Sequence, residues 1–139
     1  MRGKLPIIVE LHRWRLAFIL TFLVIVCARW AGIEAWASDT PFADEWDAEG
    51  VFLYPKLADG TLSAADFFHP ANEHHIIFTH LLNSLLLYIN GQWDPIVQMM
   101  ASSSIMAFVY AFLAYQISKR SPPILACGGT VVCILLAGC

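Results

Sequence analysis

Apolar residues gather into four long stretches of the chain, with polar segments between them. The stretches at 16–37 and 96–117 contain 22 residues each, and another begins at Ile124. The hydrocarbon core of a bilayer is about 30 Å thick, so an α-helix needs about 20 apolar residues to cross it. The pattern therefore predicts transmembrane helices at 16–37 and 96–117, and the start of a third at 124–139.

The remaining apolar stretch, residues 76–90, has a different pattern. At about 1.5 Å per residue its helix would be roughly 22 Å long, which is too short to cross the hydrocarbon core. Its polar residues share one side of a helical wheel, with the apolar residues opposite. We therefore expect an interfacial helix at about 75–90 that lies on the membrane surface. The polar residues are Thr79, His80, Asn83, Ser84 and Asn90.

Composition supports a membrane protein and argues against a soluble domain and a nucleic-acid-binding protein. Hydrophobic residues are 58% of the 139 positions and charged residues 14%, whereas soluble domains average about 45–50% and about 25%. The net charge is -3 without a basic run, so we expect membrane lipid and no nucleic acid as a partner. The predicted fold class is all-α, a fragment of a polytopic helical membrane protein, because 124–139 is too short to complete a crossing.

Charges at the ends of the apolar stretches predict the topology. Residues 1–15 contain four basic residues and one acid, and Lys119-Arg120 follows the 96–117 stretch. The positive-inside rule then makes 1–15 a cytoplasmic N-terminus, 38–95 an outer loop and 118–123 a cytoplasmic turn. We expect a multi-pass protein of the cell inner membrane. A cleaved signal peptide is the alternative, since Ala35-Trp36-Ala37 has the form of a cleavage site.

The predicted outer loop is strongly acidic, with nine Asp or Glu residues and one base, Lys56. Asp44, Glu45, Asp47 and Glu49 fall within six residues, in a short helix that we expect to run to about Leu57 with an interruption near Gly50. Carboxylates this close repel one another unless a metal ion or a proton relieves them. The cluster indicates a general base or a divalent-cation site, or alternatively a solvated acidic loop.

Histidines form a second candidate cluster just before the interfacial helix. His74 and His75 follow Asn72-Glu73, and imidazoles with a carboxylate can hold a metal ion. The spacing is not the His-Glu-x-x-His pattern of metalloproteases. A protonated imidazole at this helix start could contact a phosphate. Alternatively, these are the ordinary polar residues at the end of an interfacial helix.

Two short motifs resemble those of a known superfamily. Phe42-Ala43-Asp44-Glu45-Trp46-Asp47 is similar to the Asp-Glu motif in the first outer loop of GT-C membrane glycosyltransferases, which include the protein mannosyltransferases. Asn72-Glu73-His74-His75 follows, with His75 where those relatives are expected to carry arginine. The order also resembles that of uncharacterised bacterial membrane proteins.

The resemblance implies the N-terminal segment of a glycosyltransferase that moves a sugar from a polyprenyl-phosphate donor to an acceptor on the outer face. It implies catalytic roles for Asp44, Glu45 and Asp47, with Asp44 as the general base. It further implies that His74 and His75 bind substrate, and that Asp44, Glu45 and His74 hold a divalent cation. We expect this segment alone to be inactive. The alternative is a non-catalytic structural membrane protein or an inactive remnant.

Overall fold

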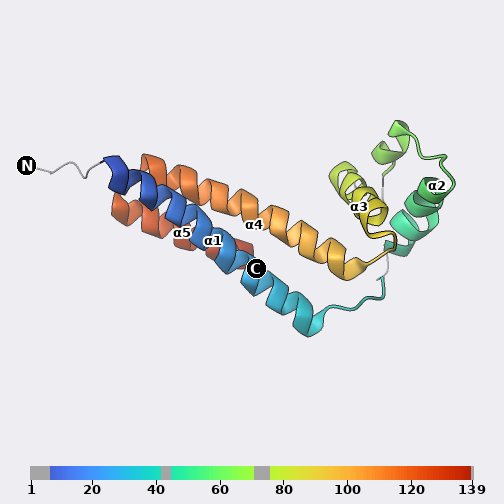
Figure 1. Cartoon of the computed structure of the whole chain (residues 1–139), viewed down its shortest axis with the longest axis horizontal. Helices are drawn as coiled ribbons and strands as arrows, with labels where there is room; N and C mark the ends of the chain where they lie inside the picture. The colour runs from blue at the N-terminus through green and yellow to red at the C-terminus, as the bar shows by residue number, and fades with distance from the viewer. Residues whose placement is uncertain (1–6, 42–44, 71–75, 139) are drawn as a thin grey trace, which may run out of the picture. The chain divides into compact units, whose positions relative to one another are not determined.

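The computed structural model describes residues 7–41, 45–70 and 76–138, and every regular element in these ranges is a helix (Figure 1). The all-α prediction is therefore confirmed for this part of the chain. The elements divide into two compact units. One contains residues up to Trp36 together with those from Met100 onward, and the other contains Ala37–Met99.

Two helices are long and apolar enough to cross a membrane. α1 (Ile7–Trp36) contains the 24-residue segment Arg13–Trp36, and α4 (Pro95–Arg120) qualifies over its 26 residues. Only 11% and 17% of their most apolar windows are buried, whereas a core helix of a soluble protein would bury its apolar residues. These helices include nearly all of the predicted crossings at 16–37 and 96–117, and they are compatible with a membrane protein.

The third predicted crossing is not confirmed. α5 (Pro123–Gly138) is a shorter apolar helix, and the candidate spans among the described residues are in α1 and α4. α5 packs beside α1, and a small apolar core joins Ile25, Ala107 and Ala137. Arg29 donates a hydrogen bond of 2.7 Å from Nε to the carbonyl of Ala137. The guanidinium thus joins α1 to α5.

The Ala37–Met99 unit is built from short helices. A π-helix, η1 (Trp46–Leu53), continues directly into α2 (Tyr54–Ala58), and a 3-10 helix, η2 (Ala64–Phe68), follows. The expected interruption near Gly50 is wrong. A Cβ atom at Gly50 would lie only 3.0 Å from the Trp93 ring. The glycine therefore lets the indole pack closely against η1, and the helix continues through this position.

α3 (Ile77–Asn90) is found where the sequence predicts the interfacial helix, and it contacts both η1 and η2. It ends at Gly91, whose φ of 72° is the left-handed conformation that glycine adopts easily. α4 begins four residues later at Pro95. The position of α3 at a membrane surface remains a prediction.

Candidate functional site

The interior of the Ala37–Met99 unit contains a carboxylate, Glu49, which is only 4% exposed. Asn83 of α3, also 4% exposed, donates a hydrogen bond from Nδ2 to Glu49 Oε1. The contact joins η1 to α3 across 34 residues of sequence. A buried carboxylate with such a donor is the central polar contact of this unit.

Burial changes the acidity of Glu49. Loss of solvation raises its pKa from the ordinary 4.5 to about 7, against the opposing hydrogen bond from Asn83. The value of about 7 for the pKa includes a smaller upward contribution from the negative charge of Glu45. Oε2 of Glu49 is buried without a hydrogen-bond partner among the described residues. Glu49 can therefore hold a proton near neutral pH. A bound proton, like a bound metal ion, relieves the repulsion between neighbouring carboxylates.

α3 turns three of its polar side chains inward and leaves large apolar side chains outward. His80, Asn83 and Ser84 are buried, and His80 Nδ1 lies 3.4 Å from the carbonyl oxygen of Phe67 in η2. On the opposite side, Phe78 is 86% exposed and Tyr88 81% exposed. This is the reverse of a helix on a water-soluble domain, which buries its apolar side.

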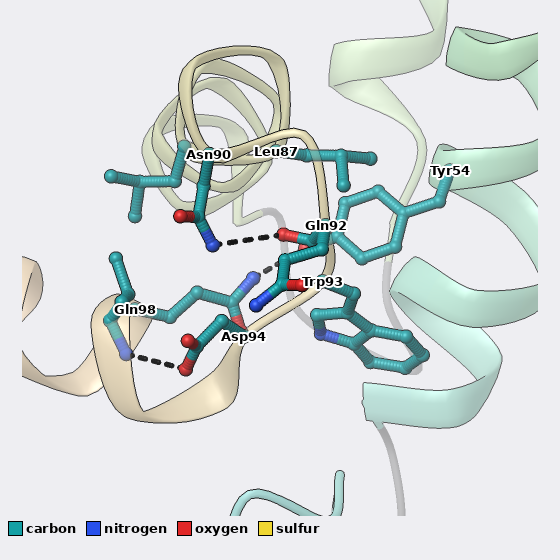
Figure 2. Close-up of a pocket in the computed structure, with 9 residues that line it drawn as sticks. Tyr54, Leu87, Asn90, Gln92, Trp93, Asp94 and Gln98 are labelled. Atoms are coloured by element: carbon teal, nitrogen blue, oxygen red, sulfur yellow. Dashed lines mark hydrogen bonds between the residues drawn. The ribbon is translucent and has the colours of Figure 1, made fainter.

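Tyr54 and Gln98 form a second polar contact in the interior. Gln98 Nε2 donates a hydrogen bond to the hydroxyl oxygen of Tyr54, and loss of solvation together with the nearby charge of Glu49 raises the pKa of this hydroxyl. The Tyr54 ring meets Trp93 edge to face, with 5.1 Å between the ring centroids. Figure 2 shows Tyr54, Trp93 and Gln98 around a small pocket that Asn90 and Asp94 also line. This pocket is too narrow to admit a water molecule.

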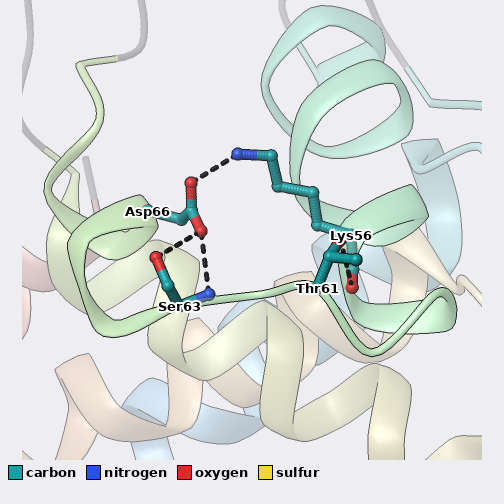
Figure 3. Close-up of polar contacts among 4 residues, drawn as sticks. All are labelled: Lys56, Thr61, Ser63 and Asp66. Atoms are coloured by element: carbon teal, nitrogen blue, oxygen red, sulfur yellow. Dashed lines mark hydrogen bonds and ion pairs between the residues drawn. The ribbon is translucent and has the colours of Figure 1, made fainter.

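Lys56, the one base of residues 38–95, is paired with Asp66 in η2 (Figure 3). Asp66 also accepts hydrogen bonds of 2.8 Å and 2.7 Å from the amide and hydroxyl of Ser63, which form the N-terminal capping box of η2. Hydrogen bonds from Lys56 and Ser63 hold the pKa of Asp66 well below its usual range. The ammonium also lies 4.2 Å from the Phe52 ring centroid. The Lys56 ammonium is therefore held by the Asp66 carboxylate and the Phe52 ring.

The structure describes only some of the residues that were predicted to form the site. Asp44, His74 and His75 lie outside the described residues. Glu45 is half-buried at the start of η1, and Asp47 is exposed on it. Within the described ranges no group of three or more His, Cys, Asp or Glu side chains could hold a metal ion. The proposed divalent-cation site is therefore neither assembled nor excluded, because two of its three members lie outside those ranges.

The structure singles out Glu49, which sequence reasoning included in the acidic cluster without giving it a separate role. The two residues that form its contact with Asn83 are visible in the sequence, but they belong to segments far apart in the chain. Glu49 is one of four clustered acids, and Asn83 is a polar residue on one side of a helix. Only the packing of α3 on η1 shows that these two residues meet.

Comparison of the chain with protein-family models, with curated proteins and with solved structures gives no match.

Proposed function

We propose that the chain is the N-terminal segment of an integral membrane glycosyltransferase, which moves a sugar from a polyprenyl-phosphate donor to an acceptor on the outer face. The observation that carries the proposal is the order of its parts along the chain. A helix long enough to cross a membrane ends at Trp36, an acidic motif follows at 44–47, and a second such helix begins at Pro95. This is the arrangement that the resemblance to GT-C enzymes implies.

The acidic motif supplies the chemistry that the transfer needs. Asp44 acts as the general base that removes a proton from the acceptor hydroxyl. The acceptor oxygen attacks the anomeric carbon of the donor sugar at the same time. The sugar–phosphate bond breaks, and polyprenyl phosphate leaves. Glu45 and Asp47 shape the field around this base or hold a divalent cation that stabilises the phosphate leaving group.

The contact between Glu49 and Asn83 gives this motif a structural support. Glu49 lies in the same helix as Asp47, and its side chain is fixed to α3 by the Asn83 amide. A helix tied to its neighbour by a buried hydrogen bond holds the side chains at its start more precisely than a free loop would. Glu49 is therefore a positioning residue for Asp47 in this proposal, and Asp44, which lies outside the described residues, is the catalytic residue.

α3 supports the membrane-surface part of the proposal. Its outward apolar side would be costly to hydrate, whereas the boundary between headgroups and acyl chains can accept it. Only four residues separate the end of α3 from the start of α4. We propose that this helix lies in the interface beside the outer end of the crossing helix.

The test uses protein expressed from the complete gene and reconstituted in proteoliposomes with a panel of polyprenyl-phosphate-linked hexoses and a membrane extract as acceptor. Release of polyprenyl phosphate is measured for wild type, Asp44→Asn and the control Asp59→Asn, which removes an exposed acid from the turn after α2. We expect Asp44→Asn to lower turnover by roughly 10²-fold or more and the control to leave it unchanged. Equal turnover in the two variants contradicts the assignment. Absence of turnover in wild type contradicts the enzyme and favours the structural membrane protein.

A further inference from the structure

Four basic side chains gather at the end of the unit where α1 begins its apolar segment and α4 finishes. Arg13 Nη2 donates a hydrogen bond of 3.1 Å to the carbonyl of Ser118, which brings the two helix ends together. Lys119 Nζ lies 5.9 Å from the centroid of the Trp14 ring. Residues 13–20 and 112–120 contain no acid. The members of this basic end are Arg13, Arg15, Lys119 and Arg120.

An apolar groove adjoins the basic end within the same unit. It has a volume of about 280 Å³ and is open on one side. α1 contributes Arg15, Phe18 and Ile19 to its lining, and α4 contributes Phe112 and Tyr115. Arg15 is therefore both a member of the basic end and a wall of the groove. The exposed surface of the groove is apolar, so Arg15 lines it with its aliphatic stem and the guanidinium lies outside that surface.

We propose that this groove binds one anionic phospholipid, with the headgroup phosphate on Arg15 and an acyl chain against Phe18 and Phe112. A guanidinium forms two parallel hydrogen bonds with phosphate oxygens. Basic pockets between membrane-spanning helices are known to select anionic headgroups. Both walls belong to helices long and apolar enough to cross a membrane, so lipid is the occupant with matching charge and matching apolar chemistry.

The groove shares no residue with the acidic motif of the proposed glycosyltransferase. Its residues lie in α1 and α4, whereas the acidic motif lies in the Ala37–Met99 unit. Lipid binding here requires no sugar transfer. Failure of one proposal therefore leaves the other standing.

The test is native mass spectrometry of the full chain released from nanodiscs that contain equal amounts of phosphatidylglycerol and phosphatidylcholine. We expect one phosphatidylglycerol molecule to be retained in preference to phosphatidylcholine. Arg15→Ala should lower its retention about fivefold, since one basic contact to an anionic lipid contributes about 1 kcal/mol. Lys119→Ala removes the same charge from the same end outside the groove, so its effect should be clearly smaller.

Two further variants separate the groove from general surface charge. Ile19→Trp fills the groove without changing charge and should lower retention, whereas Arg15→Lys keeps the charge and should preserve part of it. Circular dichroism of each variant checks that helix content is unchanged. Equal losses in Arg15→Ala and Lys119→Ala overturn the proposal in favour of diffuse attraction. Full retention in Ile19→Trp, or equal retention of the two lipids by wild type, also overturns it.

Discussion

Asn83 of α3 donates a hydrogen bond to the carboxylate of Glu49 in η1, and both side chains are buried. The two residues are 34 positions apart in sequence and join η1 to α3. The other carboxylate oxygen has no partner among the described residues, and unpaired buried charge is costly. Protonation of Glu49 therefore matters for the stability of the Ala37–Met99 unit.

The first prediction is a loss of stability as the pH rises. A carboxyl whose pKa is about 7 when folded and 4.5 when unfolded binds its proton more tightly in the folded state. Its contribution is complete below about pH 4.5 and is lost as the pH approaches 7, by about 3 kcal/mol. Asp66, whose pKa is lowered, loses its contribution only below its ordinary 3.8, which is outside this window.

Glu49→Gln should remove this dependence, because its amide oxygen can still accept from Asn83 without ever carrying a charge. The measurement is denaturant unfolding in micelles between pH 4.5 and 8, followed by tryptophan fluorescence. The background variant replaces the three tryptophans outside the unit with Phe, so that only Trp46 and Trp93 report. A decline of the same size in wild type and Glu49→Gln would assign the pH dependence to another group. The replaced tryptophans are Trp14, Trp30 and Trp36.

The second prediction concerns the donor of this pair. Asn83→Leu leaves Glu49 buried without its hydrogen bond, and we expect a loss of about 1–3 kcal/mol in the free energy of unfolding. Thr79→Leu is the control, because Thr79 is exposed on the same helix, where substitutions usually change stability by less than about 0.5 kcal/mol. The same unfolding assay at pH 8 compares them. Similar small effects would show that the hydrogen bond contributes little to the folded unit.

The long apolar helices were predictable because length and composition are local properties. The stretches 16–37 and 96–117 fall almost entirely within α1 and α4. The tertiary role of Glu49 was not predictable, because neighbouring acids look alike in sequence and only the contact with Asn83 distinguishes one of them. Gly50 was misread for a related reason. The role of Gly50 depends on Trp93, which lies far away in sequence, just before α4.

The third prediction uses two adjacent glycines of α5. A side chain at Gly129 would lie 2.6 Å from Cγ2 of Ile117, whereas one at Gly128 meets nothing within 4 Å. Ile117 is β-branched and cannot easily rotate away within a helix. Gly129→Ala should therefore lower the thermal stability of the full chain. Gly128→Ala should keep or raise it, by up to about 1 kcal/mol through better helix propensity. A gain in both variants would mean that α5 moves freely past α4.

The fourth prediction places α3 in the membrane interface. Leu85 is 53% exposed on its apolar side, and Asn90 is exposed near its C-terminal end. Leu85→Lys should weaken membrane contact of the helix, whereas Asn90→Lys should have little effect. A nitroxide at Phe78, 86% exposed, reports depth by its accessibility to oxygen against a water-soluble nickel complex. A label that is more accessible to the nickel complex than to oxygen would place α3 in water.

The fifth prediction is the topology, with the N-terminus inside and residues 38–95 outside. It follows from the basic residues of the segment 1–15, before the apolar part of α1, and from Lys119 and Arg120 at the end of α4. Single cysteines at Asp59, in the turn after α2, and at Arg120, in the last turn of α4, are both on exposed positions. They are introduced after the four native cysteines have been replaced by serine or alanine. A membrane-impermeant maleimide applied to intact cells should label position 59 and should reach position 120 only after the membrane is opened. Labelling of position 120 in intact cells would reverse the topology, and with it the outer-face location of the acidic motif.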